Sequence, residues 1–574
     1  MIILGIWDGH DAGAAVIVDG QVTAAINEER LTRRKLEVAF PGLAIRACLA
    51  QAGIQPGDVD IVAASTSDVA KALARVAPST KESYYQVRRR KVDPGTGSRV
   101  RLRAKYLVTE WPPNRASRLA STWALGRTLR AAGLGRATLQ LHDHHACHAA
   151  AAACTSGFDS ALVVTIDGVG DGAAATVSQY DAGTLALLAT TPARHSPGVF
   201  FEHVTHLLNM RELEDEGKVM ALADHAAPVP DTENAMFRLL GADGDRFVTP
   251  SAARGLGGPL ARILWRYPNE QFAYMAQRAL ERAAVGVVGH ALARTGQRRV
   301  ALGGGVASNV KLNRRIRLLP GVEDVYVFPH MGDGGLAFGA AALSHLRLGR
   351  SPALRLGDLG LGPDYSETDI ARALQAGALP HERPHDLAGA VARLLLEDGV
   401  VLWFQGRMEF GPRALGHRSM LARPDRPAMR DRLNLLTKRR VWYQPFCPSI
   451  LEQDARRALA DFDGRPNPHM TMAYMVAPAH RPALAGVVNV DGSCRPQMVP
   501  DDDTGLFAEL LRRMRQATGM GAVLNTSLNL HGSPLVCTPE EAVDVFVASD
   551  ADALAIGPFL VARRHRSGHT MEQA

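Results

Sequence analysis

The sequence lacks the features that mark exported, membrane-spanning and disulfide-rich proteins. No run of 18 apolar residues occurs in it, so no membrane-spanning helix is expected. The opening residues, MIILGIWDGHD, have no basic segment followed by a long apolar stretch, so no signal peptide is expected and the predicted location is the cytoplasm. The six cysteines include no CxxC pair, which argues against a cysteine-ligated zinc site and against a disulfide framework.

The size and charge of the chain narrow its class further. Its 574 residues are too many for one core and predict two or three domains. The formal net charge is +7, and a dense basic run extends from Arg88 to Lys105. A solvated loop would explain this run as well as contact with an anionic substrate, a membrane surface or nucleic acid. No RNA-binding signature accompanies it, so nucleic acid is not the expected partner.

Two segments of the chain share one layout. Residues 1–30 alternate apolar, partly β-branched runs with Asp-Gly turns, a pattern that predicts consecutive strands. Residues 160–190 repeat the order of strand, Gly/Asp-rich turn and strand. Two such units predict a duplicated α/β fold of the actin, hexokinase and Hsp70-like type, with nucleotide bound between the halves.

The rest of the chain reads as two α/β domains. Residues 269–295 are predicted to form a long amphipathic helix. The segment 351–366 is rich in Gly, Pro and Ser and lacks helical periodicity, so it is predicted to be a linker. It separates an actin-like domain, 1–350, from a second α/β domain, 367–565, and a polar tail follows at 566–574.

The stretch LHDHHACHAAAAAC holds four histidines in seven positions. His144 and His148 are four residues apart, so on a helix they lie on one face and can share a metal ion. Asp333, in the glycine-rich sequence HMGDGG, is the predicted third ligand. His142 and His145 are then left for supporting or substrate contacts. A pair of polar residues at a helix start is the plainer reading of HxxxH alone.

Glycine- and aspartate-rich turns in the first domain are candidate nucleotide contacts. Aspartates in a tight turn can orient phosphates through a metal or water, and a glycine-rich turn before a helix lets the backbone approach an anion. Ordinary tight turns explain each of these patterns equally well when it is taken alone. The predicted contacts are Asp167, Asp171, Lys218, Gly304, Gly305 and Asn309.

Cationic side chains gather in the second domain. GRMEFGPRALGHRSMLARP holds Arg407, Arg413 and Arg418 within twelve residues in a constrained Gly/Pro context, and arginine binds phosphate and carboxylate bidentately. A strand ending in Asn-Thr-Ser offers hydroxyls and amides to a phosphate. The predicted contacts in this domain are Arg413, Arg418, Lys438, Arg495, Asn525, Thr526 and Ser527.

Taken together, these motifs resemble the O-carbamoyltransferases of antibiotic and nodulation-factor biosynthesis. The motifs are HDAGAAVIVDG with NEERLTRRK, DHHACHAA, DEGKVMALA, GGGVASN, GDGGLAFGAA, GRMEFGPRALGHRS and LNTSLNLHGSPLV, in the family's order. The resemblance implies an N-terminal domain similar to the tRNA threonylcarbamoyl transferases and a C-terminal domain with the YrdC fold.

The resemblance also implies a mechanism with two sites. The YrdC-like domain would convert carbamoyl phosphate and ATP, bound with Mg²⁺, to carbamoyl adenylate, using Arg413, Lys438, Arg495 and Ser527. The N-terminal domain would transfer the carbamoyl group to a hydroxyl of a small natural product or sugar. His144, His148 and Asp333 would hold the metal, which is iron by the resemblance, although zinc or manganese would also suit this ligand set. His10 and Asp11 match the acceptor region, and His10 is a candidate general base.

The sequence departs from the family after Lys438. Relatives commonly read K-x-R-E-x-F-R-P-F, whereas this chain has Val441 and Gln444 in place of the usual Glu and Arg. One arginine contact to carbamoyl phosphate is therefore missing, and Arg439 or Arg440 is expected to compensate.

Two other functions stay open on the sequence alone. The first is a tRNA carbamoyl-type modification enzyme that uses the basic run as an RNA patch. The second is a non-catalytic nucleotide sensor on an actin-like scaffold. The acceptor is not readable from the motifs, and a homodimer is an open alternative.

Overall fold

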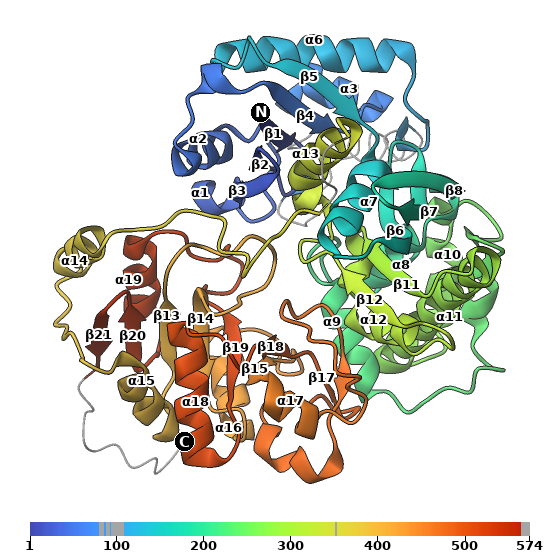
Figure 1. The fold of residues 1–574 in the computed structure, drawn as a ribbon. Coiled ribbons are helices and arrows are strands. Elements are labelled where there is room, and N and C mark those ends of the chain that lie inside the picture. The colour runs from blue at the N-terminus through green and yellow to red at the C-terminus, as the bar shows by residue number, and fades with distance from the viewer. Residues whose placement is uncertain (80–84, 88–91, 93–107, 350–352, 564–574) are drawn as a thin grey trace.

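The computed structural model describes residues 1–79, 85–87, 92, 108–349 and 353–563. Two five-stranded sheets occupy the N-terminal part of these residues, and a seven-stranded sheet organises the C-terminal part (Figure 1). The described residues include no helix that is both long and apolar enough to cross a membrane. The basic run 88–105, apart from Val92, and the tail 566–574 lie outside them.

The first sheet is an antiparallel meander extended by two parallel strands, in the order β3-β2-β1-β4-β5. Its strands are β1 (Ile2–Trp7), β2 (Gly13–Val18), β3 (Gln21–Asn27), β4 (Ile61–Ser65) and β5 (Thr138–His142). Successive side chains of β1 point to opposite faces, so Leu4 packs in the cluster that contains Leu49 of α2 (Gly42–Ala52), while Ile3 packs in the cluster of α13 (Leu336–Arg347). Covering both faces explains why β1, β2 and β4 are almost fully buried.

The second sheet repeats the first. Its order, read from the opposite edge, is β8-β7-β6-β11-β12, with β6, β7 and β8 antiparallel and β6, β11 and β12 parallel. The strands are β6 (Ser160–Gly170), β7 (Ala173–Asp181), β8 (Thr184–Pro192), β11 (Arg299–Gly303) and β12 (Asp324–Val327). The predicted duplicated α/β fold of the actin and hexokinase type is therefore confirmed.

Alanine-rich helices let the two halves approach closely. α7 (His144–Thr155) and α13 contact each other between the sheets, and their alanines are almost fully buried (Figure 1). A Cβ atom at Gly339 of α13 would lie only 2.4 Å from the carbonyl oxygen of Cys147 in α7. Larger side chains would separate the helices, and the histidines at the start of α7 would then lose their place between the halves.

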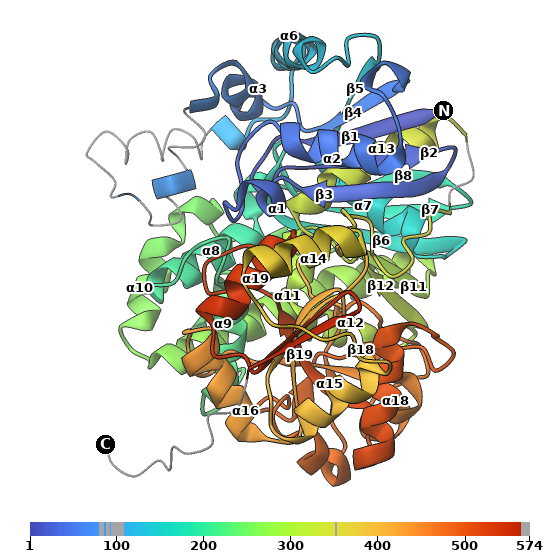
Figure 2. The same cartoon turned by 90° about the vertical axis from the view of Figure 1, so that its left-hand side faces the viewer.

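Longer helices flank the second half. The helix predicted over 269–295 is present as α11 (Asn269–Thr295), and its buried residues recur at helical spacing. The other helices of the N-terminal part are α1 (Glu29–Thr32), α3 (Val69–Val76), α6 (Arg115–Ala131), α8 (Pro197–Leu207), α9 (Glu216–Leu222), α10 (Gly257–Leu264) and α12 (Val310–Arg317). Figure 2 shows α6 along the outer edge of the first half, far from the C-terminal part.

The C-terminal part is built on one mixed sheet in the order β18-β15-β19-β14-β13-β20-β21. Its strands are β13 (Val401–Phe404), β14 (Arg418–Ala422), β15 (Cys447–Leu451), β18 (Gln497–Val499), β19 (Ala522–Ser527), β20 (Ala553–Ile556) and β21 (Phe559–Ala562). Its helices are α14 (Glu367–Ala376), α15 (Leu387–Leu396), α16 (Pro427–Asp431), α17 (Glu452–Ala458), α18 (Leu506–Thr518) and α19 (Pro539–Ala548). α15 and α18 contact each other and share one core with Trp403 of β13.

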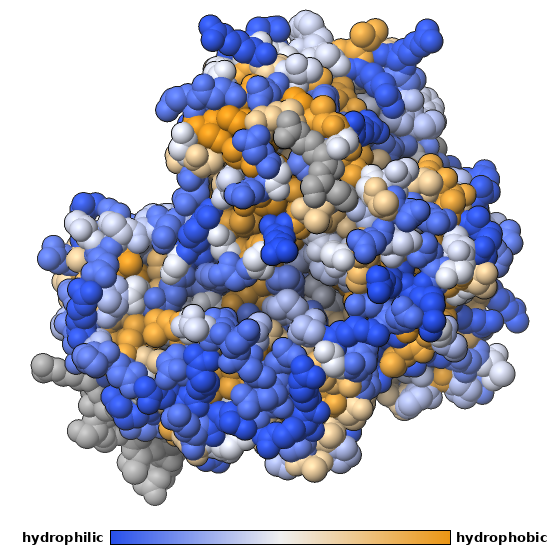
Figure 3. All heavy atoms as spheres, viewed as in Figure 1, coloured by the Kyte–Doolittle hydropathy of each residue, from blue (hydrophilic) through white to orange (hydrophobic). Residues whose placement is uncertain are grey.

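The segment predicted as a linker packs against the N-terminal part. Leu354 donates its backbone N–H to Cys154, and Ala25 of β3 donates its N–H to Leu361. Arg407 then clamps this segment from the C-terminal part, because its guanidinium donates to the carbonyl oxygens of Leu361 and Thr23. Figure 3 shows the surface hollowed where the N- and C-terminal parts meet.

Candidate active sites

Four buried side chains meet between the two halves of the N-terminal part. The Nε2 atom of His144 lies 2.9 Å from Oδ2 of Asp167 and 3.5 Å from Oδ1 of Asp333. The Nε2 atom of His148 lies 3.7 Å and 3.5 Å from the same two oxygens. One potential ligand atom from each of the four residues lies within 4.8 Å of the others. The structure thus brings the three predicted metal ligands together and adds Asp167, which the sequence had suggested as a nucleotide contact.

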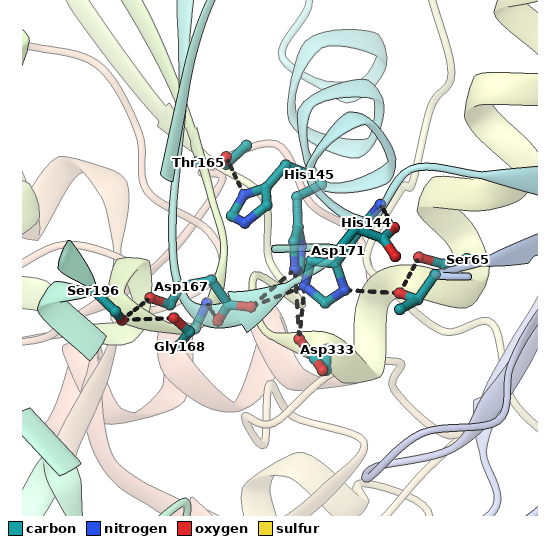
Figure 4. A network of polar contacts seen from close by, with 12 residues as sticks. Ser65, His144, His145, Thr165, Asp167, Gly168, Asp171, Ser196 and Asp333 are labelled. Carbon is teal, nitrogen blue, oxygen red and sulfur yellow. Dashed lines mark hydrogen bonds and ion pairs between the residues drawn. The ribbon is translucent and has the colours of Figure 1, made fainter. Parts of the chain in front are cut away.

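Neighbouring side chains orient the histidines. The Nδ1 atom of His144 bonds the hydroxyl of Thr66, at 3.0 Å, so its Nε2 atom faces the carboxylates (Figure 4). His145 points elsewhere, with its Nδ1 atom 2.7 Å from the hydroxyl of Thr165. Histidines that bind metals commonly fix their second ring nitrogen in this way. His144 and His148 are therefore the pair that the chain prepares for a shared ligand.

The charge state of the group fits a cation. Burial alone would lower the pKa of His144, but Asp333 and Asp167 outweigh it and raise the pKa to about 9. Burial would raise the pKa of Asp167, but the nearby imidazoles of His144 and His148 hold it well below its usual range. The Nε2 atom of His148 is buried and has no hydrogen-bond partner among the described residues. Two imidazoles and two carboxylates are a donor set that iron, zinc and manganese accept.

Gly170, at the end of β6, lies directly against His144. A Cβ atom there would lie 2.1 Å from Cγ of the imidazole, so Gly170→Ala must displace the ring. We expect this variant to lose most of its bound metal, measured by inductively coupled plasma mass spectrometry of the purified protein. Gly168→Ala is the matched control, because its Cβ would contact only Glu202, at 3.4 Å. Equal metal content in the two variants would contradict the placement of His144.

A cavity of about 360 Å³ opens beside the four residues. His10 lies on its wall, with its Nδ1 atom 3.5 Å from Oδ2 of Asp333 and 3.1 Å from the hydroxyl of Tyr85. Burial, together with the carboxylate of Glu29, raises the pKa of Asp11, the neighbour of His10, to about 8. The rest of the wall is mostly apolar, with Val199, Phe201, Met220 and Leu280 among its residues.

The predicted nucleotide contacts of this domain divide into two groups. Gly305 lines the cavity and donates its N–H to Oδ1 of Asp167, and Gly304 donates its N–H to the carbonyl of Met331. Asn309 also lines the cavity, but its side chain caps α12 and bonds Gln277.

Two of these contacts lie elsewhere. Both carboxylate oxygens of Asp171 are engaged by backbone N–H groups, those of Ser67, Asp68 and His144, so Asp171 holds the loop rather than facing the cavity. Lys218 pairs with Asp215, three residues earlier, at 2.7 Å.

A second site lies in the C-terminal part, where four cations gather: Arg413, Lys438, Arg440 and Arg495, here called the cationic cluster. Burial and the nearby Arg495 lower the pKa of Arg413 to about 9, and burial likewise lowers the pKa of Arg440 to about 9. Burial, reinforced by Arg440 and Lys35, lowers the pKa of Lys438 well below that of free lysine. None of the four forms an ion pair with a carboxylate in the described part of the chain.

The cluster keeps donors unused. Nε of Arg413 and Nη2 of Arg440 are buried without a hydrogen-bond partner among the described residues. Lys438 donates to Ser527 and to the side chain of Asn529, which ties it to the end of β19. Unmatched buried cations with free N–H groups form a site for an anion with several oxygens, such as a phosphate.

Three predicted residues of this domain have other positions. Asn525 is buried and donates to the carbonyl of Ala414 and to Ser449, so it joins two segments of the domain. Arg418 is buried at the start of β14, where its guanidinium lies 3.5 Å from the ring of Phe404 and donates to the carbonyl of Gln405. Thr526 pairs through its backbone with Met420 of β14. Their contact with nucleotide stays a prediction, and Nε and Nη2 of Arg418 are buried without a hydrogen-bond partner among the described residues.

The two arginines expected to compensate for Val441 and Gln444 lie in different surroundings. Arg440 belongs to the cationic cluster, whereas Arg439 is exposed. Gln444 keeps its side-chain oxygen buried without a partner in the described residues, and it lines a small cavity with Trp442 and His225.

Comparisons with known proteins identify the family of the chain. The family model for the carbamoyltransferase N-terminus matches residues 2–249 and 258–342, and the model for the carbamoyltransferase C-terminus matches residues 392–563. Nodulation protein NolNO of Sinorhizobium fredii is 33% identical over 97% of this chain and 80% of its own length. Nodulation protein NolO of Bradyrhizobium diazoefficiens is 34% identical over 74% of this chain and 79% of its own length.

Among solved structures, component A of the (R)-2-hydroxyglutaryl-CoA dehydratase of Acidaminococcus fermentans covers 60% of this chain and 99% of its own, with 15% identity and a TM-score of 0.34. The assignment of fold therefore rests on the repeated strand order. The assignment of family rests on the two models. Their matched residues include the group of His144, His148, Asp167 and Asp333 and also the cationic cluster. The chain belongs to the carbamoyltransferase family and is a carbamoyltransferase.

Proposed function

We propose that the protein is an ATP-dependent O-carbamoyltransferase that works in two steps at two sites. In the C-terminal part, water cleaves carbamoyl phosphate to carbamate and phosphate, and the carbamate oxygen attacks the α-phosphorus of ATP, which releases pyrophosphate. In the N-terminal part, a hydroxyl of a small natural product or sugar attacks the carbamoyl carbon, and AMP leaves. The acceptor proton passes to a basic group in the cavity.

The observation that carries the proposal is the cationic cluster. ATP with Mg²⁺ and carbamoyl phosphate are both rich in anionic oxygens, and the cluster offers unused N–H donors that no carboxylate of the described residues pairs with. A site that bound a neutral substrate would keep these cations desolvated at a large cost. Bound phosphates offset that cost, so the same charges that destabilise the empty site favour the substrates.

The N-terminal cavity suits the transfer step. Its four-residue group would hold a metal, and a bound metal would supply Lewis-acid stabilisation of charge on the carbonyl and phosphoryl oxygens. His10 lies on the wall beside Asp333 and Tyr85, in reach of a hydroxyl bound in the cavity. The apolar part of the wall would limit the access of water, which competes with the acceptor for the carbamoyl group.

The two parts are coupled through direct contacts. Pro412, which adjoins Arg413, lines the N-terminal cavity, and Arg30 donates to the carbonyl of Gly411. Lys35 of the N-terminal part is close enough to influence the charge of Lys438. These contacts support transfer of an adenylate between the sites within one molecule.

The test is pyrophosphate release without any acceptor. We expect release from ATP that depends on carbamoyl phosphate, and formation of hydroxyurea when hydroxylamine is added, because hydroxylamine attacks an activated carbamoyl group. A control without ATP measures direct attack on carbamoyl phosphate. Pyrophosphate release that ignores carbamoyl phosphate would contradict the adenylating step.

A further inference from the structure

Helix α6 and the loop after it carry positive charge without any negative charge. From Trp111 to His142 the sequence holds five arginines, at 115, 118, 127, 130 and 136, and no aspartate or glutamate. The helix lies along the outer edge of the N-terminal part in both views (Figures 1 and 2). This charge therefore faces solvent at the end of the molecule opposite the C-terminal part.

Large apolar side chains share that face. Leu119 is 71% exposed, and Trp111 and Trp123 are each 58% exposed. Leu119 and Trp123 are one helical turn apart, and Arg115 and Arg127 continue the same stripe at spacings of four residues. The opposite face of α6 is buried through Ala124, Leu125 and Leu129. The stripe therefore points away from the core. Hydrophilic and hydrophobic residues lie side by side along this upper edge in Figure 3.

We propose that this face of α6 rests on the surface of an anionic lipid bilayer. The stripe is a convex helix face rather than a groove, and its leucine and tryptophan are flanked by an arginine at each end. A bilayer surface offers phosphates to the arginines and, just beneath them, an apolar layer to the indole rings. A nucleic acid would pair with the arginines but would leave Leu119 in water.

The stripe is connected to the N-terminal cavity through the loop that precedes α6. The loop at Trp111 and Pro112 packs on the turn between β6 and β7, because a Cβ atom at Gly172 would lie 2.8 Å from the Pro112 nitrogen. Asp171 of the same turn accepts the N–H of His144, and Thr109 lines the cavity. Docking of α6 would hold the cavity close to the lipid headgroups. The contact itself does not depend on the proposed carbamoyl chemistry, and its test needs no substrate.

The test is co-sedimentation of the full chain with vesicles of phosphatidylglycerol and phosphatidylcholine, and with vesicles of phosphatidylcholine alone. We expect binding to the anionic vesicles only, and weaker binding as salt rises. Arg118→Gln and Arg127→Gln should each lower the partition coefficient about fivefold, the effect of one basic residue near an anionic surface. Trp123→Ser should lower it by a similar or larger factor.

Matched controls carry the same changes elsewhere. The control variants are Trp265→Ser, at a tryptophan that is 91% exposed, and Arg372→Gln, in α14. Neither variant should change the partition coefficient. Equal binding to both kinds of vesicle, or equal losses in the controls, would overturn the proposal. So would a gel shift of bulk tRNA that the α6 variants abolish while anionic vesicles fail to bind, because this result assigns the face to RNA.

Discussion

His148→Ala should abolish metal binding and slow carbamoyl transfer to a hydroxyl by about 100-fold or more, while pyrophosphate release continues. Metal affinity and activity fall about 10–100-fold when only a residue that supports a metal ligand is changed, and the loss of a ligand itself should exceed this. Release should continue because the cationic cluster lies in the other part of the chain. Metal content, pyrophosphate, and carbamoylated products from a panel of monosaccharides and polyols are the measurements, the last by mass spectrometry.

His145→Gln is the control for the neighbouring position. His145 bonds Thr165 through Nδ1 and does not belong to the four-residue group, so this variant should retain its metal. A loss of metal equal to that of His148→Ala would mean that the wrong face of α7 has been assigned. A parallel loss of pyrophosphate release in His148→Ala would show that the two sites do not work as separate half-reactions.

Three members of the four-residue group could be predicted from the sequence, because the local spacing of residues shows which side chains can meet. His144 and His148 share a helix face through a spacing of four, and Asp333 is followed by glycines that let its loop approach. Asp167 carries no such signal. It stands in a Gly/Asp-rich turn that resembles any hairpin loop, and the packing of α7 on β6 brings it to the histidines. The way a helix packs on a strand is not written in the residues around one position.

The same limit applies to the predicted nucleotide contacts of the C-terminal part. Asn525 and Arg418 belong to motifs full of polar residues, and sequence cannot show which of these turn inward. Asn525 bonds Ala414 and Ser449, which are 111 and 76 residues away, so its role depends on the register of β19 against its neighbours. The fold itself was easier to predict, because the strand-turn-strand layout occurs twice and each occurrence supports the other.

Arg413→Met should have two opposite effects, a large loss of adenylation and a gain in the stability of the free protein. Arg413 faces Arg495 and has a buried Nε without a partner. Without ligand, this charge is desolvated and repelled, so an apolar side chain of similar length should raise the free energy of unfolding by about 1 kcal/mol. Pyrophosphate release should fall about 100-fold, because a charged contact to a phosphate is lost. Thermal unfolding of the free protein and the pyrophosphate assay measure the two effects.

Arg407→Met is the matched control, because it shows what the loss of an arginine does to stability when that arginine has partners in the fold. Both residues lie in GRMEFGPR. Arg407, however, donates to the carbonyl oxygens of Thr23, in the N-terminal part, and of Leu361 and Gly362, in the segment predicted as a linker. Its loss leaves those acceptors without a charged donor and should lower stability by about 1.5–3 kcal/mol. Opposite signs of the stability change at two arginines six positions apart would show that Arg413 is kept for its substrate and not for the fold. A loss of stability at both positions would mean that the cationic cluster is neutralised by a partner within the chain, and the anion site would have to be sought elsewhere.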